Sequence, residues 1–140
     1  DEMIAVARDL IGGDRKSTMP LASEIMELDA SLYTDPERFE REKHMIFRRL
    51  PLVLAASCEL REPGSYKAMY VAGVAVLLVR GRDGTARAFL NVCTHRGAII
   101  AEGLGSASRF VCSYHGWTFD NDGTLVGVSS RAEFGELDVG

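Results

Sequence analysis

Apolar residues at the start of the chain have the spacing that is typical of a helix. In residues 2–11 three of them share one helical face, at intervals of three and four: Ile4, Ala7 and Ile11. The pair Gly12-Gly13 follows directly, and glycine is the residue that most often ends a helix. We therefore expect a short helix over residues 2–11.

A second and stronger helix is predicted over residues 35–49. The segment Thr34-Asp35-Pro36-Glu37 has the pattern of a capping box with proline in the first turn. Four apolar residues share one face, at offsets of seven, eight and eleven from the first: Phe39, Ile46, Phe47 and Leu50. We expect this face to belong to the core. His44 lies among charged neighbours on the same helix and is expected to be a solvated surface residue.

After Pro51 the pattern changes from helical spacing to short apolar runs separated by turn residues. Strands are predicted over residues 52–56, 66–79, 86–92, 109–111, 117–119 and 124–128; the second run contains one or two strands, bent or bulged near Gly73. Asn121-Asp122-Gly123 is a strong hairpin turn. The chain is therefore expected to form a helical arm over residues 1–50 and a mostly β domain over residues 51–140.

Composition limits the class of protein and its partners. The 140 residues are 46% hydrophobic and 26% charged, with a net charge of −4, which is typical of one globular domain with its own core. An acidic chain is a poor match for nucleic acid or an anionic membrane, since both attract basic surfaces. The longest uncharged apolar run, residues 69–79, is too short to cross a bilayer. We expect no nucleic-acid and no membrane partner.

Most of the cysteines and histidines lie in two short segments. Cys93-Thr94-His95 and Cys112-Ser113-Tyr114-His115 contain two of the three cysteines and two of the three histidines, with sixteen residues between His95 and Cys112. The remaining Cys58 is expected to be a small core residue. Three cysteines are too few for a disulfide framework, and the charged first ten residues do not resemble a secretory signal. We therefore expect a reducing, cytoplasmic setting, in which clustered thiols and imidazoles indicate a metal site.

Two cysteines and two histidines can bind either a zinc ion or an iron–sulfur cluster, and ligand type alone does not separate the two. Here each segment supplies one of each, whereas in a common zinc-finger pattern one segment supplies both cysteines. If the segments face each other, the thiolates can meet on one metal and the imidazoles on a second. A two-iron cluster needs this division. Gly97 and Gly116 would let backbone amides approach bridging sulfides. A structural zinc module is the alternative.

Both segments resemble one known motif. Cys93-Thr94-His95-Arg96-Gly97 and Cys112-Ser113-Tyr114-His115-Gly116-Trp117 are similar to the Rieske 2Fe–2S motif, and the similarity extends over about residues 31–128. The resemblance implies that Cys93 and Cys112 bind one iron of a Rieske-type 2Fe–2S cluster and that His95 and His115 bind the other. It places further residues around the cluster: Arg96, Gly97, Tyr114, Gly116 and Trp117. Trp117 is expected to serve as core, as a shield for the cluster, or as both.

The resemblance also implies a fold and a branch of the family. Rieske domains are mostly β, an antiparallel β sandwich with a cluster-binding subdomain of two hairpin loops, here preceded by the helical arm. The branch found in cytochrome bc complexes has an extra disulfide between the loops, but this chain has Ala98 and Tyr114 at the matching positions. That branch also has hydroxyl donors where this chain has Trp117 and Phe119. Fewer donors lower the potential, so we expect roughly −150 to 0 mV.

Within the remaining branches the chain is most similar to oxygenase α-subunits. The loop forms His95-Arg96-Gly97-Ala98 and Tyr114 to Phe119 resemble those of aromatic-ring-hydroxylating oxygenases, as does the helical segment from Tyr33 to Phe47. Leu50-Pro51 departs from the tryptophan that many of these enzymes have there. A stand-alone Rieske ferredoxin, which carries electrons to a separate oxygenase, is the alternative.

The resemblance implies partners and a second metal that this chain does not bind. In such an oxidoreductase, often a dioxygenase, a reductase or ferredoxin delivers electrons derived from NAD(P)H. They leave through His95 or His115 to a mononuclear Fe(II) in the catalytic domain of the same or a neighbouring subunit, often within a homotrimer. That iron needs two histidines and a carboxylate, and only His44 is left over. We therefore expect no catalytic residues in this chain and a catalytic domain after residue 140 of a longer protein.

Overall fold

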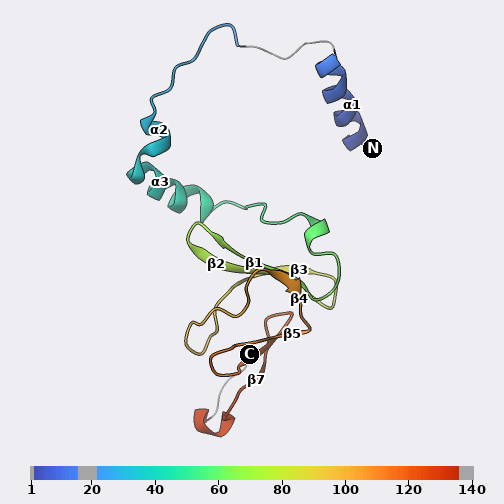
Figure 1. The fold of residues 1–140 in the computed structure, drawn as a ribbon, viewed down its shortest axis with the longest axis vertical. Helices are drawn as coiled ribbons and strands as arrows, with labels where there is room; N and C mark the ends of the chain where they lie inside the picture. Colours follow the sequence, from blue (N-terminus) through green and yellow to red (C-terminus); the bar gives the residue numbers. More distant parts are fainter. Residues whose placement is uncertain (1, 16–21, 136–140) are drawn as a thin grey trace. The chain divides into compact units, whose positions relative to one another are not determined.

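The computed structural model describes residues 2–15 and 22–135 of the chain, which falls into two units, Asp1–Pro36 and Glu37–Gly140 (Figure 1). The first unit contains α1 (Glu2–Arg15) and α2 (Ser31–Thr34). The predicted helix end at Gly12-Gly13 is wrong, because α1 continues through both glycines. Glycine permits a helix end without forcing one. Among the described residues, none of the helices has the length and apolar character needed to cross a bilayer.

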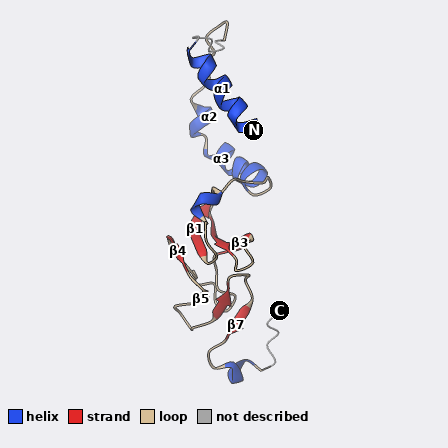
Figure 2. Cartoon of the chain, turned by 90° about the vertical axis from the view of Figure 1, so that its right-hand side faces the viewer, coloured by secondary structure: helices blue, strands red, loops and turns tan. Residues whose placement is uncertain are grey.

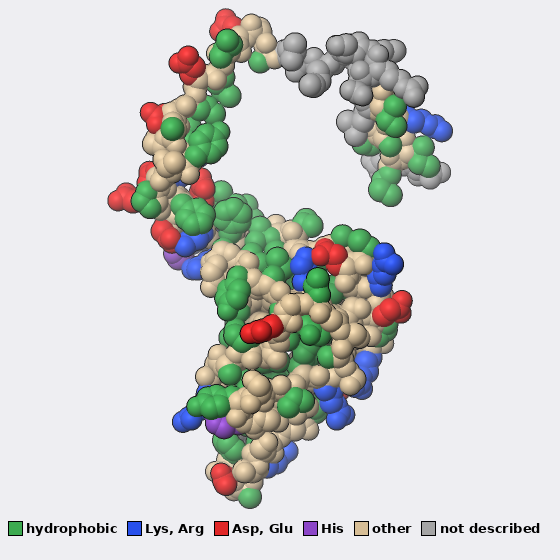
Figure 3. Space-filling model, viewed as in Figure 1, with side chains coloured by type: hydrophobic (Ala, Val, Ile, Leu, Met, Phe, Trp, Pro, Cys, Tyr) green, Lys and Arg blue, Asp and Glu red, His purple; other side chains and the backbone are tan. Residues whose placement is uncertain are grey.

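The second predicted helix is divided in the structure. α3 (Pro36–Glu42) is α-helical, and the turn that follows, Lys43–Phe47, is π-helical. The four apolar residues expected in the core are all exposed, by 42–56%: Phe39, Ile46, Phe47 and Leu50. Hydrophobic side chains are accordingly visible on this part of the surface (Figure 3). The core prediction is wrong because periodicity determines which side chains share a face, whereas tertiary packing decides whether that face is covered. His44 is exposed, as predicted.

The apolar run over residues 52–56 does not form the predicted strand. It is irregular and leads into a 3-10 turn at Ser57–Glu59. A strand needs a neighbour to complete its hydrogen bonds, and none of the strand pairs among the described residues includes this run; β1 (Ser65–Val71), which follows the turn, pairs on both sides with other strands. Cys58 lies in the 3-10 turn and is exposed, so the prediction that it is a core residue is also wrong.

The larger sheet has four antiparallel strands in the order β3–β2–β1–β4. Besides β1 it contains β2 (Val74–Arg80), β3 (Ala86–Leu90) and β4 (Leu104–Ser106). The bend predicted near Gly73 is a hairpin turn between β1 and β2, in which Ala72 and Gly73 have positive φ values of 49° and 80°. Such turns match the twist of paired strands. β4 has no strand pattern in its sequence, and it forms because Lys67, Tyr66 and Ser65 of β1 pair with it.

The smaller sheet has three antiparallel strands in the order β5–β6–β7. They are β5 (Arg109–Val111), β6 (Thr118–Asp120) and β7 (Leu125–Gly127), and the predicted turn at Asn121-Asp122-Gly123 joins the last two. A short 3-10 helix, η3 (Arg131–Phe134), follows β7 (Figure 2).

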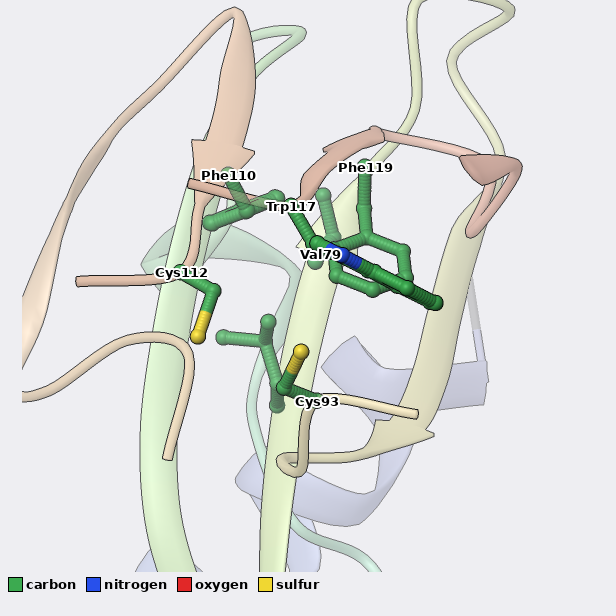
Figure 4. Packing of buried hydrophobic residues seen from close by; sticks show 7 residues of the cluster. Val79, Cys93, Phe110, Cys112, Trp117 and Phe119 are labelled. Carbon is green, nitrogen blue, oxygen red and sulfur yellow. The ribbon is translucent and has the colours of Figure 1, made fainter. Parts of the chain in front are cut away.

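Buried residues from both sheets form one core cluster that includes two of the cysteines (Figure 4). Its members are Leu77, Val79, Cys93, Phe110, Cys112, Trp117 and Phe119. The structure confirms the predicted mostly β, antiparallel sandwich. The predicted metal-ligating thiols are therefore part of the packing between the sheets.

Candidate metal centre

The first Cys/His segment is a tight loop that follows β3. Cys93 N–H donates a hydrogen bond to Ala98 O at 2.7 Å, and Gly97 N–H donates to Cys93 O at 2.8 Å. Gly97 has a φ of 72°, a left-handed value that costs a residue with a Cβ about 1–2 kcal/mol. These bonds close the loop around His95.

The second segment lies between β5 and β6 and repeats this backbone pattern. Cys112 N–H donates to Trp117 O at 2.8 Å, Gly116 N–H donates to Cys112 O at 2.9 Å, and Gly116 has a φ of 70°. Counted from its cysteine, each loop is therefore built on the same two hydrogen bonds. The histidine is the second residue after the cysteine in the first loop and the third in the second, where it is His115.

Cys93 and Cys112 are buried, with 3% and 2% of their surface exposed, and neither forms a disulfide. Their sulfur atoms lie in the space between the two loops (Figure 4). Burial raises the pKa of the Cys93 thiol, although backbone N–H groups of its own loop donate hydrogen bonds to the sulfur, which act to lower the pKa. Burial acts in the same direction at Cys112, but N–H donors of its loop and the Cys93 thiol together lower the pKa of the Cys112 thiol. Both sulfur atoms thus have amide donors that favour the thiolate.

The imidazoles of His95 and His115 face each other, with ring centroids 4.6 Å apart. The Nδ1 atom of each ring is buried and has no hydrogen-bond partner among the described residues. Burial lowers the pKa of His95, and the proximity of His115 and Arg96 lowers it further, so the neutral form of His95 is favoured. Neutral imidazole nitrogen is a metal ligand, and a buried nitrogen without a partner costs free energy. Two such atoms together indicate a bound group.

Comparison with protein families identifies the domain that contains this pair of loops. The family model of the Rieske [2Fe-2S] domain matches residues 51–137, which is more than half of the chain. The chain belongs to the Rieske [2Fe-2S] domain family.

The relatives of this Rieske domain are oxygenase subunits. The chain is 41% identical over 106 residues to the chlorobenzene dioxygenase subunit alpha of Cupriavidus sp. (strain PS12), covering 75% of this chain and 24% of that one. It is also 41% identical over 104 residues to the carnitine monooxygenase oxygenase subunit of Escherichia coli (strain K12), covering 74% of this chain and 28% of that one. The chain thus spans about a quarter of the length of these curated relatives and corresponds to their Rieske region.

Solved structures lead to the same assignment. A quaternary ammonium Rieske monooxygenase in complex with L-carnitine superposes with a TM-score of 0.72 at 36% identity, over 78% of this chain and 31% of that one. Naphthalene 1,2-dioxygenase with bound indole gives a TM-score of 0.68 at 40% identity, over 74% of this chain and 24% of that one. The fold of the Rieske domain is therefore shared with both mono- and dioxygenases.

The residues of the two loops fit the 2Fe–2S cluster that this family implies. The buried donors form a sulfur pair, Cys93 and Cys112, and a nitrogen pair, His95 and His115. A Rieske cluster needs two cysteines on one iron and two histidines on the other. Two thiols and two imidazoles are thus the ligand types that the two irons of such a cluster take.

Aromatic side chains cover the two imidazoles to different degrees. The Trp117 ring stacks on His95, with centroids 4.8 Å apart and planes inclined by 9°, and only 5% of Trp117 is exposed. Trp117 is thus both a core residue and a cover for His95. Tyr114 stacks on His115 at 3.8 Å and 28°, but 60% of its own surface is exposed. Arg96, directly after His95, is exposed.

Sequence reasoning missed Asn91, which holds the first loop in place. Asn91 is 3% exposed, and its Nδ2 donates to Ala101 O at 2.7 Å while its Oδ1 accepts from the N–H groups of Ile100 (3.2 Å) and Ala101 (3.1 Å). The side chain thus ties the start of the loop to the residues after its end. Asn91 directly follows β3, and a polar residue at the end of this run, two positions before Cys93, is the signal that points to it, since buried amides need partners.

Proposed function

We propose that Cys93 and Cys112 hold one iron of a 2Fe–2S cluster through Sγ, and that His95 and His115 hold the other through Nδ1. One observation carries the proposal: two buried imidazole nitrogens without partners lie with two buried thiols on loops of the same backbone design. Neither nitrogen has another use among the described residues, and the family model supports the same donor types.

The protein groups have distinct tasks in this proposal. Backbone N–H groups of His95 and Arg96 donate to Cys93, and those of Tyr114 and His115 donate to Cys112, so that both sulfurs are stabilised as thiolates. Two thiolates balance the charge of two ferric ions with two sulfides, and the neutral imidazoles add none. When bound, the cluster supplies a one-electron carrier. Trp117 excludes water from the His95 ring, and stacking on the indole keeps the imidazole plane nearly parallel to it.

The domain serves, in this proposal, as the electron-transfer part of an aromatic-ring-hydroxylating-type oxygenase. A reductase or ferredoxin reduces it, and a mononuclear iron in the catalytic domain of the same or a neighbouring subunit receives the electron. The relatives support this role because they are oxygenase subunits about four times as long as the matched region. A dioxygenase subunit and a carnitine monooxygenase subunit match equally, at 41%. Equal similarity is expected where the substrate pocket lies in another domain.

Residues 51–140 are the proposed Rieske domain, and residues 1–50 the proposed helical arm.

The test is the metal content and spectrum of the protein after anaerobic purification. We expect iron and acid-labile sulfide in equal amounts, about two of each per chain, and an EPR signal after reduction with dithionite. NAD(P)H should reduce the cluster only when a reductase is added, because in this proposal the reductase transfers the electrons from NAD(P)H to the cluster. Zinc without sulfide would replace the proposal with the structural zinc module. The stand-alone ferredoxin would be favoured if the polypeptide contains no catalytic domain and its reduced cluster transfers electrons to a separate oxygenase.

A further inference from the structure

The segment after β7 returns to the second loop. A Cβ built on Gly116 would lie 2.7 Å from Ser129 Oγ and 4.0 Å from Ser129 Cβ, so the Ser129 side chain lies directly against the second loop. Ser130 then adopts a left-handed φ of 55° and turns the chain into η3. Val128 and Phe134, on either side of this turn, pack against the core cluster.

Phe134 ends η3 against the aromatic rings of the metal centre. Its ring centroid lies 5.5 Å from that of His95, with the planes inclined by 85°, and 5.5 Å from that of Trp117, with the planes inclined by 77°. These are edge-to-face contacts, the geometry that aromatic pairs prefer. His95 is thus in contact with three rings, those of Trp117, His115 and Phe134.

The surroundings of the two imidazoles therefore differ. Among the described residues, the rings that contact His115 are those of His95 and Tyr114, and Tyr114 is itself 60% exposed. Trp117 is 5% exposed and Phe134 is half-buried, so the His95 side is the more enclosed. Since Phe134 comes from outside both loops, η3 contributes to an enclosure that the loops do not complete by themselves.

We infer that Phe134 is a positioning residue, which holds the His95 imidazole against Trp117 and keeps water from that side of the metal centre. This inference rests on the proposed function, because it assigns Phe134 an effect on the bound cluster. Reduction adds one negative charge to the centre, and a nonpolar wall solvates that charge less well than water does. Removing the ring should therefore favour the reduced form.

The experiment compares F134A and F134L with F134Y and with F89A. F134Y keeps an aromatic ring. F89A removes a ring of the same size from β3, where Phe89 packs on Gly123 and, among the described residues, makes no ring contact with either histidine. We expect F134A to raise the reduction equilibrium constant by up to about tenfold, which corresponds to ~59 mV for one electron. F134L should show a smaller rise, whereas F134Y and F89A should match the wild type. The EPR signal of the reduced protein should change in F134A but not in F134Y or F89A.

A second readout does not depend on the metal. Trp117 is the only tryptophan of the chain, so its fluorescence reports this contact directly. In metal-free protein, F134A should shift the emission to longer wavelength, because water reaches the indole. Unchanged emission and potential in both F134A and F134L would overturn the inference, and so would an equal potential shift in F89A. If even the wild type takes up no cluster, the proposed function fails, and the fluorescence then decides separately whether Phe134 encloses the site.

Discussion

The rings of His95 and His115 face each other at 4.6 Å and 64°, although the two residues occupy different positions in their loops. His95 is the second residue after its cysteine and His115 is the third, while both loops share the same two backbone hydrogen bonds. The pairing of the imidazoles is therefore not a consequence of exact repetition. It depends on the way the two sheets bring the loops together, and it leaves two Nδ1 atoms buried without a partner.

Replacing one of these histidines should remove the cluster. We expect H95A to lose the Rieske absorption and EPR spectrum, because the second iron would keep one protein ligand where it needs two. C112A should lose it as well. The matched control is H44A, since His44 is an exposed histidine on another element and its replacement should leave iron content and spectrum unchanged. Retention of the spectrum in H95A would exclude His95 as a ligand.

The midpoint potential should lie at the low end of the Rieske range, at roughly −150 to 0 mV. Phe119 is 8% exposed and carries no hydroxyl, so it offers the site no O–H donor. F119Y places a hydroxyl where the cytochrome bc branch has one, and we expect it to raise the potential. A hydrogen-bond donor that favours the reduced state by about 1.4 kcal/mol would raise the reduction equilibrium constant tenfold, which corresponds to a rise of ~59 mV in the midpoint potential. Redox titration of both proteins checks this, and a wild-type value above about +100 mV would contradict the branch assignment.

Asn91 should be important for stability and for cluster retention. N91A removes three hydrogen bonds to the segment after the first loop and leaves two N–H groups and a carbonyl without partners, so we expect a loss of about 2–3 kcal/mol in unfolding free energy. N121A is the matched control: Asn121 is 2% exposed, but within the described residues its side chain makes a single hydrogen bond, from Nδ2 to Ala107 O at 3.1 Å. Urea denaturation and the rate of iron release measure the two effects. Equal losses in both variants would contradict the role of Asn91.

The two loop glycines provide a test of backbone strain. Gly97 and Gly116 have nearly the same φ, 72° and 70°, so alanine at either position should cost about 1–2 kcal/mol. A Cβ at Gly97 meets no atom within 4 Å, whereas at Gly116 it meets the Ser129 hydroxyl. G116A should therefore be the less stable variant, and adding S129A should bring its cost to that of G97A. Thermal denaturation of the three variants decides this, and no rescue by S129A would show that the contact is unimportant.

Acid should weaken the turn between β2 and β3. The Arg87 guanidinium donates to both oxygens of Asp83, at 2.9 and 2.7 Å, and with Thr85 N–H it holds the pKa of Asp83 well below its usual range. A carboxyl with a lowered folded-state pKa contributes stability above its unfolded pKa of about 3.9, and this is lost as the pH falls toward the folded value.

We therefore expect wild type to have a higher Tm than D83N at pH 7, and the difference to shrink as the pH falls below about 4. In an R87Q background the effect of D83N should be smaller at every pH, because the main partner of the carboxylate is absent. A Tm difference that grows on acidification would contradict this assignment.

The sequence alone determined the donor types, their spacing and the turns that separate the strands. Cys93, His95, Cys112 and His115 could be selected because thiols and imidazoles are rare and stand in two short segments. The hairpin turn at Asn121-Asp122-Gly123 was predictable, and so was a break in the run at Gly73, because glycine and asparagine report local backbone conformation; that the break is a hairpin turn came from the structure. These are properties of neighbouring residues, which a linear pattern contains in full.

Only the tertiary structure decided which distant segments meet. Asn91 bonds to Ala101, Phe134 packs on His95, and β1 pairs with β4, and the local sequence identifies none of these partners, even where it marks Asn91 as unusual. The apolar face over residues 39–50 has the pattern of a core helix, yet it is exposed because no other described element covers it. A periodic pattern describes one element, whereas burial and contact depend on a second element that the fold places beside it.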